Sequence, residues 1–374
     1  MRNLRTLTLA SLLVFALVFA GGCVSDQSVI SQANQMNGQL KPAIMEDPEL
    51  ASYLQKVGDR IIGSAKELDA QGYGPKSHKS GDNTWMFGNN MKFHFVNSKT
   101  VNAFTTGGDH MYVYNALFQM CKNEDELAAV MSHEYGHVYA RHVAKGMNRQ
   151  YAALAGAAAL AGAGYVAGGK EHGAEYAGLG FAGGAAAGSF LNMGFTRGDE
   201  AEADKLGFDF YTHAGWEPDH FAEFFEDMIK AGYDKTPAVA SDHPTLASRV
   251  EEANKRVKDL PPAAKNWLKP PVADDAEFAR LKARASQLAK STPDDTTLAN
   301  SQQLLQALPR SCIIPYTTQD ELTARKAIAA KANAAQSSGG EQAKKKKKHP
   351  TPPPADSASA TPAAPANQVI SSPH

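Results

Sequence analysis

The sequence predicts an α+β fold that is mainly helical and carries one small β-sheet. Apolar residues recur at helical spacing over residues 48–62 and again in the stretch that follows Asn123. Between them, residues 91–114 contain three short stretches rich in aromatic and β-branched residues, which indicates a small sheet. Helical composition after residue 259 predicts a helical C-terminal extension, and the end of the chain is expected to be a disordered tail.

The first 22 residues have the layout of a secretory signal peptide. Arg2 and Arg5 precede an apolar run over residues 7–20, which is too short for a comfortable membrane span. The small residues before Cys23 resemble a bacterial lipoprotein signal, with Ala20 where leucine is usual. This resemblance implies that Cys23 is lipidated, becomes the mature N-terminus and anchors the chain to a membrane.

The predicted location is the periplasmic side of the outer membrane. Val24 follows the cysteine, and by analogy with such lipoproteins this residue favours the outer membrane. Simple cleavage, which would release a soluble periplasmic protein, is the alternative. The polar residues 23–45 are predicted to form a tether with some helix.

The charge of the chain argues against a strongly charged partner. With 38 Lys and Arg against 39 Asp and Glu, the formal net charge is −1, so no nucleic acid is expected to bind. Besides Cys23, the chain has Cys121 and Cys312, which could pair in an oxidising compartment. Two buried thiols are an equally good interpretation.

The strongest motif is Ser132-His133-Glu134-Tyr135-Gly136-His137, which reads H-E-x-x-H. Asn123 is a good N-cap and Glu126 stands at the third helical position, so the motif is predicted to lie on a capped helix that ends near Gly146. His133 and His137 are then one turn apart on one face and supply half of a tetrahedral zinc site. Glu134 is placed to act as general base on the water at the metal.

A zinc peptidase needs a third protein ligand. Val143 and Ala140 stand where the metzincin pattern requires His and Gly, so that pattern fails. Glu200 and Asp204 are four residues apart and share a helical face, whereas Glu202 points to another side. Glu200 can ligate zinc, and Asp204 can hold a ligand histidine through its other ring nitrogen. An acidic helix alone is more often a solvated face, and the upstream motif favours the ligand interpretation.

Three motifs together resemble a known family. His133-Glu134-x-x-His137, Glu200-x-Glu-Ala-Asp204 and Asp242-His243-Pro244 are similar to motifs of the gluzincin metallopeptidases of the HtpX and CAAX-prenyl-protease type. The similarity is greatest to the periplasmic lipoprotein branch, the BepA-like and LoiP-like proteins, and covers about residues 45–255. It implies a zincin-type metallopeptidase domain and a metalloendopeptidase that binds one zinc ion per chain. The implied ligands are His133, His137 and Glu200.

The resemblance also favours an active-site role for His243. This residue could donate a hydrogen bond to the developing oxyanion, or occupy the fourth zinc position and block the site at rest. A capping or core histidine is the alternative, and Arg249 is a possible orienting partner. The strand edge formed by Asn102, Ala103 and Phe104 can bind an extended peptide substrate by adding it as a further strand.

The catalytic domain is expected to cover residues 46–258. Within it, residues 151–195 are nearly uncharged, with glycines recurring every four residues, and are predicted to form a packed helical hairpin. A membrane span or a membrane-dipping loop is the alternative. The helical extension is expected over residues 259–336, and a Lys-, Pro- and Ala-rich disordered tail over residues 337–374.

The predicted function is zinc-dependent hydrolysis of peptide bonds in misfolded or misassembled envelope proteins, a form of quality control. The expected partners are polypeptide substrates and, by resemblance, outer-membrane proteins and their assembly machinery. An outer-membrane protein assembly factor with latent protease activity is the first alternative. A cell-wall peptide amidase is the second, although the sequence has no sign of a wall-binding repeat.

Overall fold

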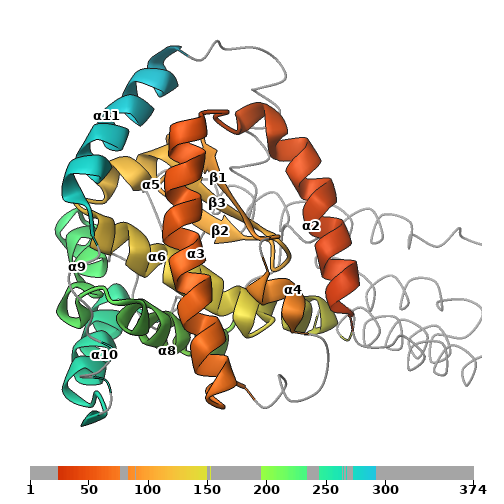
Figure 1. Cartoon of the computed structure of the whole chain (residues 1–374), viewed down its shortest axis with the longest axis vertical. Helices are drawn as coiled ribbons and strands as arrows, with labels where there is room; N and C mark the ends of the chain where they lie inside the picture. Colours follow the sequence, from red (N-terminus) through yellow and green to blue (C-terminus); the bar gives the residue numbers. More distant parts are fainter. Residues whose placement is uncertain are drawn as a thin grey trace, which may run out of the picture. The chain divides into compact units, whose positions relative to one another are not determined.

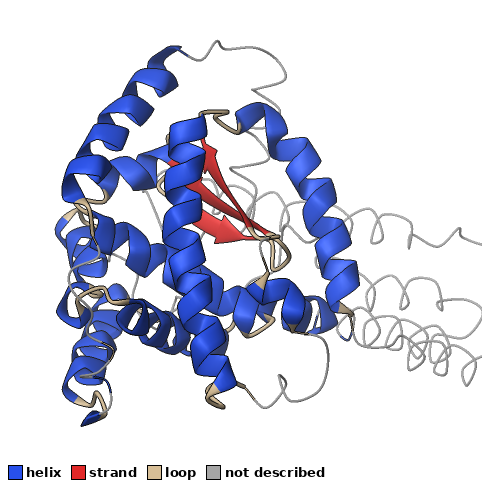
Figure 2. Cartoon of the chain, in the orientation of Figure 1, coloured by secondary structure: helices blue, strands red, loops and turns tan. Residues whose placement is uncertain are grey.

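The structure is a computed structural model that describes residues 24–75, 83–88, 90–149, 152, 195–233 and 244–291, with gaps at 263, 265–266 and 268–272. All of these residues fall in Met1–Thr317, the first of two compact units of the chain. Figure 1 and Figure 2 show that helices dominate this unit and surround a small sheet. The predicted α+β class, mainly helical with a small β-sheet, is confirmed.

Along the chain, the strands of the sheet come between two groups of helices. In order the elements are α2 (Asp26–Leu40), η1 (Lys41–Ala43), α3 (Pro48–Ala70), α4 (Thr84–Phe87), β1 (Lys92–Val96), β2 (Ala103–Thr105), β3 (His110–Tyr114), α5 (Asn115–Met120), α6 (Glu124–Tyr139), α8 (Arg197–Ala214), η5 (Pro218–His220), α9 (Glu223–Lys230), α10 (Leu246–Lys258) and α11 (Asp275–Ser291).

The three strands lie in the order β1-β3-β2. β1 pairs with β3 in parallel, and β2 pairs with β3 antiparallel, with Ala103 opposite Val113. On the outer side of β1, Ile44 forms one antiparallel bridge to Val96. Within the described ranges no strand pairs with the outer side of β2, so β2 forms an edge of the sheet.

Both faces of the sheet are covered by helices, and alternate side chains point to opposite faces. One face joins the main core with α3 and α6 and carries Phe93, Phe95, Ala103, Met111 and Val113. The other face packs against Met36 and Leu40 of α2 and carries Val96, Phe104, Tyr112 and Tyr114. This double cover explains why all five residues of β3 are buried.

The segment predicted to be a tether contains α2, which belongs to the folded unit. Ser25 caps this helix by accepting the Ser28 N–H, and Val29 and Leu40 are buried. Leu40 lies against the sheet, whereas Val29 belongs to a small apolar cluster with Val143 beyond the end of α6. Asp26–Leu40 of the segment predicted to be a tether with some helix therefore form a packed helix, because its apolar positions have two surfaces to cover.

The helix predicted after Asp47 is longer than expected. Asp47 caps α3 by accepting the Leu50 N–H at 3.0 Å, and Pro48 occupies the first helical position, but the helix continues past Ile62 to Ala70. Leu68 in the added part is buried in the main core, and this packing extends the helix.

The described part of the C-terminal extension includes one helix, α11. Three of its side chains, Phe278, Leu281 and Ala285, lie in the main core, where α11 packs on α5 and α3. The predictions for residues 153–194, for the tail over 337–374 and for Cys312 lie outside the described residues, and Cys121 is a buried free thiol. None of the helices that the structure describes is long and apolar enough to cross a membrane.

Candidate metal centre

The H-E-x-x-H motif lies near the middle of α6, a helix whose sixteen residues are all buried. Asn123 accepts the Glu126 N–H at 2.9 Å, which confirms the predicted N-cap. Glu126 accepts the Lys122 N–H at 2.9 Å, one residue earlier than a capping box requires. Tyr53 and Trp216 donate hydrogen bonds to Glu124. These acidic side chains sit at the positive end of the helix dipole and fix where the helix begins.

α6 ends earlier than the predicted Gly146. Its last residue is Tyr139, and Arg141 adopts a φ of 57°, the left-handed conformation that side chains rarely take. The chain is helical again over residues 142–149. The interruption changes the direction of the chain, so His142 turns back toward His137.

The third residue of the centre comes from the first turn of α8. Thr196 accepts the Asp199 N–H at 3.1 Å, and the Asp199 carboxylate accepts the Thr196 N–H at 2.9 Å, a complete capping box. Arg149 also donates to Asp199, at 2.7 Å. These contacts start α8 at Arg197 and carry Glu200, which is fully buried, to the face of α6 that bears the two histidines.

His133, His137 and Glu200 meet as the sequence predicts. The two Nε2 atoms are 3.2 Å apart, and Glu200 Oε2 and Oε1 lie 3.7 Å and 3.8 Å from Nε2 of His133 and His137. A tetrahedral zinc site with bonds of about 2.0–2.2 Å separates its ligand atoms by roughly 3.3–3.6 Å. The three separations lie within about 0.2 Å of this range, so the arrangement is close to that of a metal site, and the ligand atoms all lie within 4.8 Å of one another.

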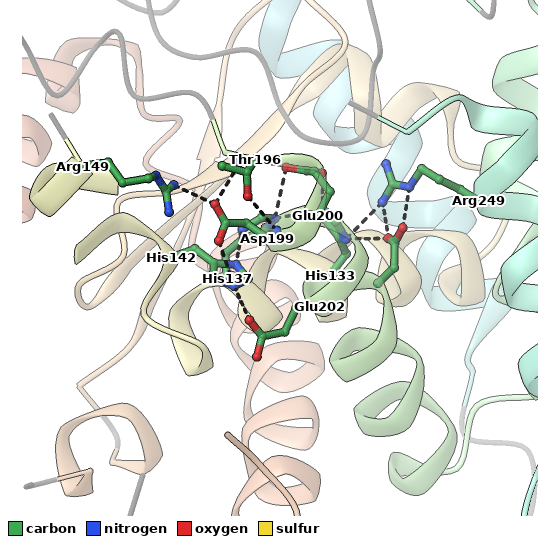
Figure 3. A network of polar contacts seen from close by, with 10 residues as sticks. His133, His137, His142, Arg149, Thr196, Asp199, Glu200, Glu202 and Arg249 are labelled. Carbon is green, nitrogen blue, oxygen red and sulfur yellow. Dashed lines mark hydrogen bonds and ion pairs between the residues drawn. The ribbon is translucent and has the colours of Figure 1, made fainter. Parts of the chain in front are cut away.

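The second ring nitrogen of His133 is held by Asp204. Nδ1 lies 2.8 Å from Asp204 Oδ1, while Arg249 Nε donates to Asp204 Oδ2 at 2.8 Å and Arg249 Nη2 donates to Oδ1. Figure 3 shows Arg249 beside His133, and its guanidinium also stacks 4.2 Å from the centre of the Phe225 ring. Asp204 thus lies beside His133, where the sequence placed it, whereas Arg249, expected as a partner of His243, contacts Asp204 instead.

The charge on Asp204 determines which nitrogen of His133 carries the proton. Burial opposes ionisation of Asp204, but the charge of Arg249 and the hydrogen bonds from His133 and Arg249 outweigh it and lower the pKa of the carboxyl below its usual range. An ionised Asp204 accepts the proton of His133 Nδ1, which leaves the lone pair of Nε2 for a metal. Arg249 Nη2 also lies 3.1 Å from His133 Nδ1. Both nitrogens carry a proton, so they do not bond to each other, and each donates to the Asp204 carboxylate.

His137 is supported by residues to which sequence reasoning gave no role. His142 Nδ1 lies 2.9 Å from His137 Nδ1, and His142 Nε2 lies 3.0 Å from Glu202 Oε2 (Figure 3). The hydrogen bond from His142 and the pairing with Lys145 lower the pKa of Glu202 to about 2 against the effect of burial. Glu202 does point away from the metal ligands, as predicted, and there it contacts His142. His142 stands five residues after His137 and Glu202 stands two after Glu200, and these short spacings are the signal that the sequence offers.

The other predicted site residues lie in three places. Glu134 is buried on α6 beside the two histidines. Asn102 precedes β2, and Ala103 and Phe104 are its first two residues, so this segment forms the edge of the sheet. The predictions for Cys23 and His243 fall outside the described residues.

Comparison with known proteins identifies the domain around this centre. Residues 86–257 match the model of Peptidase family M48. The chain is 28% identical over 266 residues to the beta-barrel assembly-enhancing protease of Escherichia coli (strain K12), which covers 68% of this chain and 47% of that protein. It is 31% identical over 175 residues to the metalloprotease LoiP of the same organism, covering 46% of this chain and 66% of LoiP.

A third relative is the putative beta-barrel assembly-enhancing protease of Vibrio cholerae, 28% identical over 229 residues, with 59% of this chain and 41% of that protein covered. The chain thus spans less than half the length of the beta-barrel assembly-enhancing proteases that it matches. The matched segment contains α6, α8 and all of α10 except its last residue, and these helices supply the residues of the centre. Residues 86–257 are therefore a metallopeptidase domain of Peptidase family M48.

Proposed function

We propose that the chain is a zinc-dependent endopeptidase. The observation that carries this proposal is the convergence of His133, His137 and Glu200, whose ligand atoms lie within 4.8 Å of one another beside Glu134. Two imidazoles and a carboxylate are a donor set that zinc prefers in catalytic sites, where a fourth position is open. All four side chains are buried, so the reaction would take place away from bulk water.

In this proposal the protein residues have distinct tasks. His133, His137 and Glu200 would hold the ion, which when bound supplies Lewis acidity for the scissile carbonyl and lowers the pKa of the attacking water. Glu134 accepts a proton from that water and returns it to the leaving amine. His243 is proposed either to donate a hydrogen bond to the developing oxyanion or to block the site at rest.

The proposed substrate site is the outer edge of β2. An extended polypeptide can add to such an edge through backbone hydrogen bonds, which do not depend on particular side chains. Ala103 and Phe104 are buried as whole residues, so neither side chain projects into solvent at this edge. α6 packs against β2, which supports placement of a bound peptide near the motif.

The proposed setting is the bacterial cell envelope. Relatives of the chain are named beta-barrel assembly-enhancing proteases, and this supports outer-membrane proteins that are misfolded or misassembled as substrates. We further propose that Cys23 is lipidated and anchors the chain on the periplasmic side of the outer membrane, with a soluble periplasmic form as the alternative. An assembly-promoting role in which proteolysis is secondary is the second candidate, because the names of these relatives include assembly.

The test compares the mature wild type with Glu134→Gln for zinc content and for cleavage of an unfolded polypeptide. One zinc per chain in both forms and cleavage only by the wild type is the expected result. If the wild type binds zinc but does not cleave the polypeptide, the assembly role would be favoured. Retention of the full biological effect by Glu134→Gln would also favour the assembly role. Absence of zinc from the wild type would overturn the proposal.

A further inference from the structure

The helix break at Arg141 brings together two histidines that an intact helix would separate. On an unbroken helix, residues five apart differ by about 140° around the axis, and their side chains face in different directions. With Arg141 at φ 57°, His142 Nδ1 instead lies 2.9 Å from His137 Nδ1, and the two rings meet at 71°. The left-handed residue therefore creates this contact.

Distant parts of the chain hold Arg141 in that conformation. Arg141 Nε and Nη2 donate to both carboxylate oxygens of Asp26 on α2 at 2.9–3.0 Å. Arg141 Nη2 also donates to Asn83, and Trp85 donates to Asp26 at 3.0 Å. A strained backbone conformation persists when several contacts determine it, and strain of this kind is concentrated at functional sites.

The proton positions follow from the metal-binding role of His137. Its Nε2 faces His133 and Glu200, so Nδ1 carries the proton and donates to His142 Nδ1. His142 then carries its own proton on Nε2 and donates to Glu202 Oε2 at 3.0 Å. His142 is fully buried, and its Nε2 also lies 3.8 Å from Asp199 Oδ1, a second carboxylate that favours a proton on this nitrogen.

We propose that His142, backed by Glu202, is a positioning residue that fixes the ring orientation and tautomer of His137. This inference rests on the proposed metal site and adds to it. The two histidines of the motif are then held differently: His133 by the carboxylate of Asp204, and His137 by a neutral imidazole that is itself held by Glu202. Partners of metal-bound histidines commonly account for about 10- to 100-fold in metal affinity.

The experiment measures Co²⁺ and Zn²⁺ affinity by chelator competition, together with the Co²⁺ absorption spectrum, on the full mature chain. His142→Leu removes the acceptor for His137 and is expected to weaken affinity about 10- to 100-fold and to change the spectrum. His142→Asn keeps an acceptor oxygen near the position of Nδ1 and is expected to restore most of the affinity. His213→Leu is the matched control, because His213 is a buried histidine bonded to Ser64 away from the centre.

A second pair of variants avoids the buried position. Glu202 is partly exposed, so Glu202→Gln is expected to fold and to weaken affinity by several-fold through His142. Lys145→Met removes the other partner of Glu202 and is expected to bind metal like the wild type.

Three outcomes separate this inference from the proposed function. Wild-type affinity in both His142→Leu and Glu202→Gln, or an equal loss in His142→Leu and His213→Leu, would overturn the positioning role alone. Tight metal binding by a wild type that cleaves no polypeptide would overturn the proposed function alone. No metal binding by the wild type would overturn both.

Discussion

Gly207 of α8 and His133 of α6 are in backbone contact. A β-carbon built on Gly207 would lie 2.8 Å from the His133 amide nitrogen and 2.9 Å from its α-carbon. Gly136 makes the reciprocal contact, since its β-carbon would lie 2.8 Å from the carbonyl oxygen of Ala203. The absence of side chains at these two positions lets the helices approach closely, and this approach brings Glu200 to the histidines.

Gly207→Ala is therefore expected to force α8 away from α6. The atoms that the new methyl group would meet belong to the backbone of His133, which cannot move aside as the end of a side chain can. We expect a loss of about 1–3 kcal/mol in the free energy of unfolding and weaker zinc binding, because the displaced helix carries Glu200. Urea denaturation and chelator competition measure the two effects.

Gly63→Ala on α3 is the matched control. A β-carbon there meets no atom within 4 Å, so the substitution is expected to stabilise the helix by about 0.5–1 kcal/mol and to leave zinc affinity unchanged. If Gly207→Ala proved as stable as Gly63→Ala, the close contact between α6 and α8 would be refuted.

Half of the metal centre can be predicted from local sequence. His133, Glu134 and His137 lie within one turn of one helix, so the helical period alone places the two histidines on one face. Asn123 caps that helix with a hydrogen bond between residues three apart, which is also a local pattern.

The other half depends on tertiary packing that the sequence pattern does not reveal. Glu200 reaches the histidines because α6 and α8 meet at Gly136 and Gly207, and an isolated acidic stretch looks the same when it faces solvent. Helical spacing made Glu200 one candidate ligand, and the upstream motif with the resemblance to known metallopeptidases favoured it.

The role of His142 was hidden for a different reason. Helical spacing predicts a continuous helix to Gly146, whereas Arg141 breaks it through contacts with Asp26, which lies 115 positions earlier in the chain. A conformation fixed by so distant a partner cannot be predicted from a local pattern.

Asp204→Asn tests the support of His133. The substitution keeps the shape of the side chain but removes the charge that Arg249 and His133 share, so we expect zinc affinity to fall about 10- to 100-fold. Breaking a buried ion pair is also expected to cost about 3–5 kcal/mol of stability. Zinc affinity by chelator competition and urea denaturation are the measurements.

Asp209→Asn on the same helix is the control for Asp204. Asp209 pairs with Lys205 one turn away, and since burial raises the pKa of Asp209, loss of its charge is expected to cost little stability. Zinc affinity in this variant should equal that of the wild type. An equal effect of both substitutions would show that Asp204 acts through general helix stability and not through His133.

The His94–His110 pair makes the cover of the sheet by α2 sensitive to acid. His94 Nε2 lies 2.7 Å from His110 Nδ1, and His110 Nε2 lies 3.1 Å from Asn34 Oδ1 on α2. Burial, with smaller contributions from the charges of His110 and Lys92, lowers the pKa of His94 to about 4, while Asp109 opposes the decrease for His110. Both rings are therefore neutral in the folded protein near pH 7.

The sign of the pH effect follows from this lowered pKa. The folded-state pKa of His94 lies below the usual value of about 6.5, so at acidic pH the unfolded chain binds more protons than the folded one. The contribution of neutral His94 to the free energy of unfolding is therefore complete above pH 6.5 and is lost as pH falls toward 4. From pH 7 to pH 5 we expect His94 to contribute a loss of about 2 kcal/mol. Urea denaturation at these two pH values measures it.

The comparison with His94→Asn isolates this contribution. Burial raises the pKa of Glu126 to about 7, so Glu126 acts in the opposite direction and can flatten the curve of the wild type. Glu126 is present in both proteins, so its contribution cancels when their free energies of unfolding are subtracted. We expect the variant to lose less stability than the wild type between pH 7 and pH 5. Equal losses would contradict the prediction.

Phe278→Ala tests whether α11 belongs to the catalytic unit. Phe278 lies beyond the predicted boundary at residue 258, yet its ring packs edge-on against Phe118 at 5.1 Å and contacts Tyr53. Lys282 of the same helix donates to the Cys121 carbonyl at 2.6 Å. A buried aromatic side chain that is truncated to alanine typically costs about 3–5 kcal/mol, and we expect a loss of this size in one cooperative urea transition.

Arg280→Ala is the matched control for Phe278, because Arg280 is on the same helix but its side chain is exposed and pairs with Glu49 at the surface. Its stability should stay within about 0.5 kcal/mol of the wild type. If Phe278→Ala behaved like Arg280→Ala, α11 would be an accessory element outside the catalytic core. If the expected loss occurs, the folded unit extends beyond the family match, because a core that excludes α11 would leave Phe118 and Tyr53 exposed.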